Sequence, residues 1–168
     1  MLAILFLYAF LSNVALAVVP HEPVVVWYGS QIGVWPTAVI ATAGTVAASW
    51  FDHRAFSRLI ARLADRKENS PGWLAWVRVQ FARAPFAVIV LSALTPLPFF
   101  PFKALAFAER FPLVPYLGAV ALGRLPRYLL LAWLGYQLKV PAWVFLAMSL
   151  PFLIPTFKRW ICPWQSVS

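Results

Sequence analysis

Charged residues are scarce in this chain of 168 residues: they make up 11% of it, whereas hydrophobic residues make up 62%. A soluble domain is about a quarter charged and about half apolar, so this composition excludes an ordinary soluble domain. The length and the apolar content indicate one compact membrane domain. A single cysteine, Cys162, excludes an intrachain disulfide.

Acidic residues are the scarcest charges, five against 14 lysines and arginines, which gives a net charge of +9. In a soluble protein this excess would suggest nucleic acid as a partner. Here the basic residues flank apolar runs, which is typical of cytoplasmic loops that face anionic lipid. We therefore expect membrane lipids, and no nucleic acid, as partners.

The sequence also lacks the residue patterns of common enzymes. His21, His53 and Cys162 are widely separated, so no metal site is predicted. No glycine-rich phosphate loop is present, and neither a Gly-x-Ser-x-Gly nor a Ser-x-x-Lys motif occurs. We predict a protein that is not an enzyme and has no cofactor.

Proline, in contrast, is abundant, with 15 residues. Residues 1–29 form two apolar pieces around a polar apex bounded by Pro20 and Pro23, and the second piece is far shorter than the about 20 residues of a span. This pattern predicts a re-entrant hairpin. Residues 1–19 resemble a signal peptide but lack a basic start, so we expect them to be retained.

A second re-entrant hairpin is predicted over residues 84–110. Its turn is expected between Thr95 and Pro101, because the prolines there cannot continue a straight helix. Proline-broken backbone is tolerated in membranes where it is buried in protein or lines a cavity. The prolines assigned to the two hairpins are Pro20, Pro23, Pro96, Pro98 and Pro101.

Three longer apolar runs, residues 30–51, 111–138 and 140–157, predict transmembrane helices. Residues 52–83 are basic, and their arginines recur every four residues, which predicts an amphipathic helix on the cytoplasmic surface. Residues 158–168 are predicted to be a cytoplasmic tail. The expected fold is an all-α membrane protein with two opposed re-entrant helical hairpins, about three transmembrane helices and this amphipathic helix, an arrangement that recurs in transporters.

Two arginines, Arg124 and Arg127, lie in the middle of the predicted span 111–138. A cation at this depth costs about 2.5 kcal/mol or more, so a chain keeps one where it faces protein, water or an anion. Residues three apart share a helix face, and Pro126 between them favours a kink. The pair either binds a lipid phosphate or forms a structural ion pair that locks the hairpins.

Glu22 is the only acid in the first fifty residues and stands at the predicted apex of the first hairpin. It is expected to pair with Arg124 or Arg127, or to take up a proton, the alternative being a solvated loop glutamate. His21 beside it can shuttle protons, although a lone loop histidine is more often incidental.

Four stretches, in this order and spacing, resemble the DedA family, whose members share the VTT or SNARE-associated domain. They are residues 20–29 (PHEPVVVWYG), 83–85 (RAP), 94–99 (LTPLPF) and 123–135 (GRLPRYLLLAWLG). The resemblance implies two opposed re-entrant hairpins, with essential acids at the first and essential arginines near the second. It also implies lipid movement, with proton coupling, in the inner membrane of a bacterium as a multi-pass protein.

By position, Glu22 matches the acid of the first hairpin, Arg83 the basic residue that opens the second, and Arg124 and Arg127 the basic pair after it. The resemblance implies that these four residues bind the substrate. The sequence departs from the family pattern where many members carry a second acid, since only Ser12 and Asn13 stand there, and at Thr95, where many carry an arginine.

The sequence therefore predicts a transport protein that moves or scrambles an anionic lipid, either a phospholipid or a polyprenyl phosphate. The alternative is a membrane scaffold or assembly factor whose charge cluster is purely structural. An enzyme acting on lipid phosphates has little support in the sequence, and a homo-oligomeric assembly stays open at this point.

Overall fold

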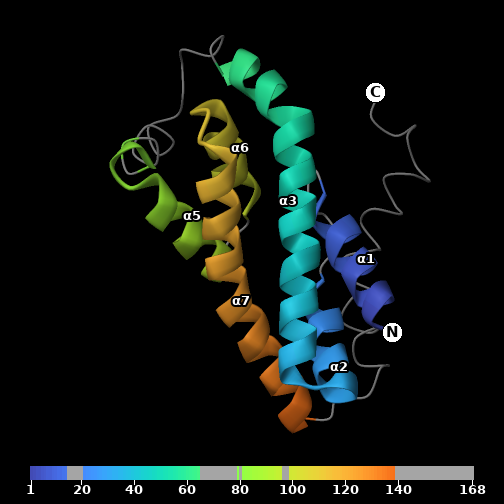
Figure 1. Cartoon of the computed structure of the whole chain (residues 1–168). Helices are drawn as coiled ribbons and strands as arrows, with labels where there is room; N and C mark the ends of the chain where they lie inside the picture. Colours follow the sequence, from blue (N-terminus) through green and yellow to red (C-terminus); the bar gives the residue numbers. More distant parts are fainter. Residues whose placement is uncertain (15–20, 65–78, 80, 96–98, 139–168) are drawn as a thin grey trace, which may run out of the picture.

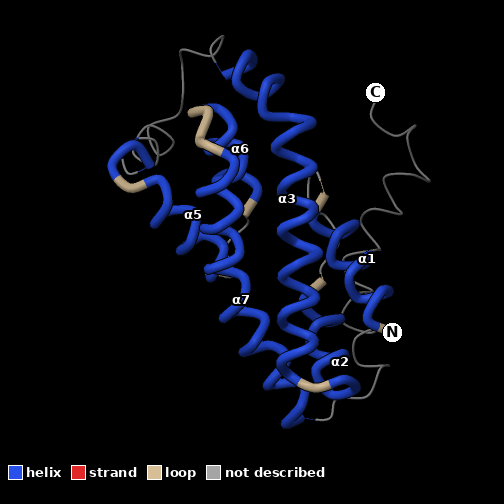
Figure 2. The backbone as a smooth tube through the Cα atoms, in the orientation of Figure 1, coloured by secondary structure: helices blue, strands red, loops and turns tan. Residues whose placement is uncertain are grey.

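A computed structural model describes residues 1–14, 21–64, 79, 81–95 and 99–138. All regular structure in these ranges is helical, and they contain no strand (Figure 2). The predicted all-α class is thus confirmed for the described part of the chain. The helices are α1 (Leu2–Asn13), α2 (Glu22–Ile32), α3 (Val34–Ala64), α5 (Pro85–Leu94), α6 (Phe100–Ala108) and α7 (Leu113–Leu138).

Two long helices, α3 and α7, pack along each other and run in opposite directions (Figure 1). Each follows a pair of short helices, α1 and α2 before α3, and α5 and α6 before α7. The first helix of each pair packs on its own long helix, α1 on α3 and α5 on α7, whereas the second crosses over, α2 to α7 and α6 to α3. The second three-helix unit therefore repeats the arrangement of the first.

Glycines allow the first helix of each pair to approach its long helix closely. A Cβ added to Gly44 of α3 would lie 2.9 Å from Cβ of Ala9 in α1, and one added to Gly123 of α7 would lie 2.7 Å from Cβ of Ala93 in α5. Small residues let helix backbones meet in membranes, where packing rather than the hydrophobic effect joins helices. The two units thus use the same contact.

The helices α3 and α7 provide two candidate membrane spans, Val34–Ile60 and Leu113–Leu138. At 1.5 Å per residue each is about 40 Å long, which exceeds the hydrocarbon thickness of about 30 Å. These spans correspond to the predicted spans 30–51 and 111–138. The predicted span 140–157 and the tail 158–168 lie outside the described residues.

The predicted boundary at residue 52, between the span 30–51 and the amphipathic segment 52–83, falls inside a single helix. The helix α3 continues unbroken to Ala64, because neither glycine nor proline interrupts it after Phe51. Asp52 is buried rather than exposed, since it faces α6. The remainder of the predicted segment 52–83 falls largely on residues 65–78 and 80, outside the described part.

The first helix pair also extends beyond its predicted end at residue 29. The helix α2 continues to Ile32 and ends at Gly33, whose φ of 91° is a backbone conformation that favours glycine. With 11 residues it is about 16 Å long, too short to cross a membrane. The predicted second piece of the first hairpin, expected to end at residue 29, thus corresponds to α2, which ends at Ile32.

Prolines begin three of the short helices. Pro85, Pro23 and Pro101 lie in the first turns of α5, α2 and α6, where a missing backbone N–H costs nothing. The turn predicted between Thr95 and Pro101 falls largely on residues 96–98, outside the described part, while α5 ends at Leu94 and α6 begins at Phe100. Pro126 lies inside α7, which continues across it. Pro20, Pro96 and Pro98 lie outside the described residues.

Candidate functional site: a buried charge cluster

An ion pair joins the start of α2 to the middle of α7. Arg127 donates one hydrogen bond from Nη2 to Oε1 of Glu22 and another from Nη1 to the carbonyl oxygen of Thr95, at 2.5 Å. A carboxylate at a helix N-terminus and a cation at a helix C-terminus both suit the helix dipole, and here these ends belong to α2 and α5. Arg127 therefore connects one end of each short-helix pair.

One turn earlier on α7, Arg124 is a buried cation that is only 4% exposed. Its guanidinium carbon lies 5.2 Å from the ring centroid of Phe99 and 5.9 Å from that of Tyr128. Its Nε has no hydrogen-bond partner, and among the described residues it forms no ion pair. Ring contacts offset only part of the cost of burying such a charge, so the charge of Arg124 is incompletely compensated by the described residues.

A hydrogen-bonded chain of three side chains crosses the same region. Nε2 of His21 lies 2.6 Å from the hydroxyl of Tyr128, and this hydroxyl lies 2.8 Å from Oγ1 of Thr45. All three residues are buried, and they come from the start of α2, from α7 and from α3. His21 is therefore an ordered member of the site and not the incidental loop histidine that the sequence favoured.

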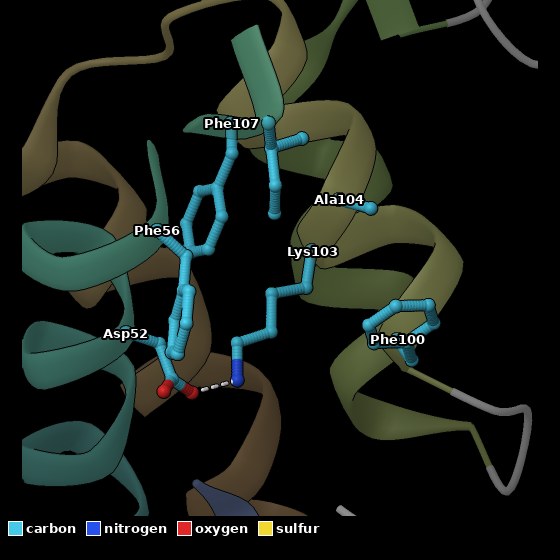
Figure 3. A pocket seen from close by; sticks show the side chains of 7 residues that line it. Asp52, Phe56, Phe100, Lys103, Ala104 and Phe107 are labelled. Atoms are coloured by element: carbon cyan, nitrogen blue, oxygen red, sulfur yellow. Dashed lines mark hydrogen bonds and ion pairs between the residues drawn. The ribbon is translucent and has the colours of Figure 1, made fainter. Parts of the chain in front are cut away.

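A second ion pair, which sequence reasoning missed, joins α6 to α3. Nζ of Lys103 donates to Oδ2 of Asp52 (Figure 3). It also donates to the carbonyl oxygen of Asn13 at the end of α1, at 3.2 Å. The side chains of Lys103 and Asp52 are 7% and 0% exposed. A signal was present: Lys103 is flanked by apolar residues on both sides, as the two arginines of α7 are.

The two ion pairs occupy equivalent places in the two units. In each pair, the second short helix of one unit (α2 or α6) is joined to the long helix of the other unit (α7 or α3). In each pair the cation also donates to a backbone carbonyl at the end of a first short helix, Arg127 at the end of α5 and Lys103 at the end of α1. The signs are reversed, since the acid is on the short helix in one pair and on the long helix in the other. With Arg124 added, three described cations face two acids, an excess of one positive charge.

An apolar cavity of about 290 Å³ borders the second ion pair. Figure 3 shows Lys103 reaching from α6 toward Asp52 of α3, with Phe56 and Phe107 beside them. The full lining is Asp52, Phe56, Ile60, Phe100, Lys103, Ala104 and Phe107. The cavity therefore combines apolar walls with one buried, charged edge.

The structure brings together three of the four predicted site residues, Glu22, Arg124 and Arg127. Arg83 is exposed and lies in a helical turn before α5, at the opposite end of α5 from Thr95. The ten residues of α5 separate these ends by about 15 Å. Arg83 is therefore not part of the cluster, whereas Asn13, which stands where many family members carry an acid, contributes its carbonyl oxygen.

Long apolar helices around a buried cluster of charges are features of an integral membrane protein. A family model described as the VTT domain matches residues 19–137, a range that includes both ion pairs and Arg124. The chain belongs to this family, the DedA or SNARE-associated group of membrane proteins, as its motifs predicted. No curated protein and no solved structure matches the chain.

Proposed function

We propose that this protein moves an anionic lipid across the inner membrane of a bacterium, and that Arg124 receives the lipid's phosphate group. The observation that carries the proposal is a buried guanidinium without an ion-pair partner among the described residues. A phosphate oxygen would supply the missing acceptor, and a guanidinium suits it because its donors match phosphate geometry. The substrate is a phospholipid or a polyprenyl phosphate.

In this proposal the two short-helix pairs are re-entrant hairpins that enter from opposite faces. The antiparallel course of α3 and α7, together with the repeated arrangement of the two units, supports this. Each of the helices α2 and α5 is about 15 Å long, which corresponds to half of the hydrocarbon layer. Charges at their inner ends would then lie near the midplane, as in transporters with discontinuous helices.

The Glu22–Arg127 ion pair would respond to the substrate. A phosphate on Arg124 also lies near Arg127, one turn away on the same face of α7. Arg127 then exchanges the Glu22 carboxylate for a phosphate oxygen, which loosens the link between α2 and α7 and releases Glu22. The release of Glu22 is the step at which proton coupling would enter.

Lipid movement in reconstituted vesicles tests the proposal. Phosphatidylglycerol with a fluorescent chain is followed between leaflets by chemical quenching of the outer leaflet, for the wild type and for Arg124→Gln. We expect the substitution to reduce the rate at least tenfold without lowering thermal stability, because it removes a charge that has no ion-pair partner. An exposed arginine on α3, changed in Arg54→Gln, is the matched control. An unchanged rate in Arg124→Gln would remove the proposed site.

A membrane scaffold is the second candidate, and the two ion pairs favour it, because they hold α2 to α7 and α6 to α3. A scaffold needs these pairs for stability only. A well-folded wild-type protein that moves no lipid in vesicles, combined with a loss of stability in Glu22→Gln, would favour this function over transport.

A further inference from the structure

A second pocket, of about 320 Å³, lies apart from the charge cluster, between α3 and the corner that joins α6 to α7. Three of its lining residues are arginines, two from α3 and one from the corner. The lining residues are His53, Ser57, Arg58, Arg62, Phe107 and Arg110. Such a concentration of guanidinium groups around a hollow suits a multiply charged anion.

The corner places Arg110 in an unusual conformation. Its φ is 53°, in the left-handed region, and it is the only described residue other than glycine with a positive φ. The N–H of Phe111 bonds to the carbonyl of Ala106 at 2.9 Å, and that of Arg110 to the carbonyl of Phe107 at 3.2 Å. This is a Schellman motif, in which the left-handed residue is usually glycine. An arginine kept there suggests that its side chain is used.

The corner is also attached to α3. Nε2 of His53 donates a hydrogen bond to the carbonyl oxygen of Phe111 at 3.1 Å, and its ring packs against that of Phe107, with centroids 5.3 Å apart. Phe107 is 2% exposed and lines the pocket. These contacts of His53 therefore fix the position of α3, with its arginines, relative to the corner that carries Arg110.

The pocket lies at the depth expected for lipid head groups. The candidate span Val34–Ile60 has 27 residues, more than the about 20 that cross the hydrocarbon layer. Arg58 and Arg62 lie at the C-terminal end of this span, and Arg110 precedes the other span, which begins at Leu113. Both sides of the pocket thus reach the same membrane surface.

We propose that this pocket binds the phosphate group of an anionic lipid from the adjacent leaflet. Phe107 also lines the apolar cavity described above, together with Phe56 and Ile60. A lipid with its phosphate among the arginines would have this cavity beside it for the first part of its acyl chain. Contact of the acyl chain with this apolar cavity would favour a lipid over a free phosphate ion. The proposal does not depend on lipid transport through Arg124.

Binding of short-chain lipids to the full-length protein in detergent micelles tests the proposal. The probes are dioctanoyl phosphatidic acid, dioctanoyl phosphatidylcholine and inorganic phosphate, each measured by calorimetry and by the shift of the unfolding temperature. The variants are Arg110→Gly and the double change Arg58→Gln with Arg62→Gln. Each is made in the wild type and in Arg124→Gln, so that binding at the buried cluster is separated from binding at the pocket.

Arg54→Gln is the matched control, because Arg54 is exposed on the same helix, lies over the ring of Trp50 at 5.5 Å and does not line the pocket. We expect phosphatidic acid to bind, Arg110→Gly to weaken binding at least tenfold in both backgrounds, and Arg54→Gln to change it less than twofold. Glycine suits the left-handed position, so Arg110→Gly removes the side chain without straining the backbone.

Three results would overturn the proposal. Equal weakening by Arg54→Gln would show diffuse attraction by surface charge. Equal binding of phosphatidylcholine, which has no net charge, would show that the pocket does not recognise an anionic lipid. Inorganic phosphate that binds as tightly as the lipid, and competes with it, would assign the pocket to a free anion. Loss of transport in Arg124→Gln with unchanged binding at the pocket would leave the two sites independent, as we expect.

Discussion

Replacing Lys103 by methionine should lower the stability of the protein, because it leaves the buried carboxylate of Asp52 without the charge of Lys103. Methionine keeps the length and apolar stem of lysine but removes the charge, so the carboxylate of Asp52, which is fully buried, loses its cation. Removing one partner of a buried ion pair destabilises a protein by about 3–5 kcal/mol. The carbonyl of Asn13 also loses a donor. We therefore expect Lys103→Met to lower the free energy of unfolding by about 3–5 kcal/mol.

The assay is unfolding in mixed micelles with increasing denaturing detergent, followed by tryptophan fluorescence. The double variant Asp52→Asn with Lys103→Met removes both charges and should recover at least half of the loss, so that the two changes are strongly non-additive. A loss below about 1 kcal/mol in Lys103→Met, or simple additivity in the double variant, would refute the burial and pairing of these side chains.

Two further predictions concern the packing of α7. Gly135→Ala should lower the free energy of unfolding by about 1–3 kcal/mol, because the added Cβ would overlap the backbone of Val26 in α2. The control Gly118→Ala, whose added Cβ would have its nearest neighbour 4.0 Å away, should be neutral or stabilising by up to about 1 kcal/mol. Equal effects of the two variants in the same unfolding assay would contradict the close contact of α2 with α7. Tyr128→Phe should cost about 1–3 kcal/mol, because buried His21 loses its hydroxyl partner, and wild-type stability would rule out that contact.

The long helices and the breaks between short ones could be predicted because their causes are local. The span 111–138 is a long apolar run, and α7 begins only two residues later, at Leu113. The end of α5 at Leu94 agrees with the prolines that follow closely in the sequence, at 96, 98 and 101. The cost of burying each charge alone predicted that Glu22 pairs with Arg124 or with Arg127. The sequence could not choose between these two arginines, because 105 residues separate Glu22 from Arg127.

The parts that were not predicted depend on distant contacts or on backbone conformation. Asp52 seemed to start a solvated segment, because its partner Lys103 lies 51 residues later. The same cost argument applies to Lys103, which lies within the predicted hairpin 84–110 and was not included among the predicted site residues. The left-handed conformation of Arg110 has no local signal, since glycine, which usually marks it, is absent there.

The central claim is that the inner ends of the short helices lie within the hydrocarbon layer, and the depth of spin labels tests it. The labels are attached by Leu94→Cys and Arg83→Cys, two exposed positions near opposite ends of α5, in a Cys162→Ser background. Accessibility to oxygen and to a water-soluble nickel complex gives the depth of each label in vesicles. We expect the label at 94 to lie near the bilayer centre, about 15 Å deeper than the label at 83. Two labels at the depth of the head groups would contradict the account.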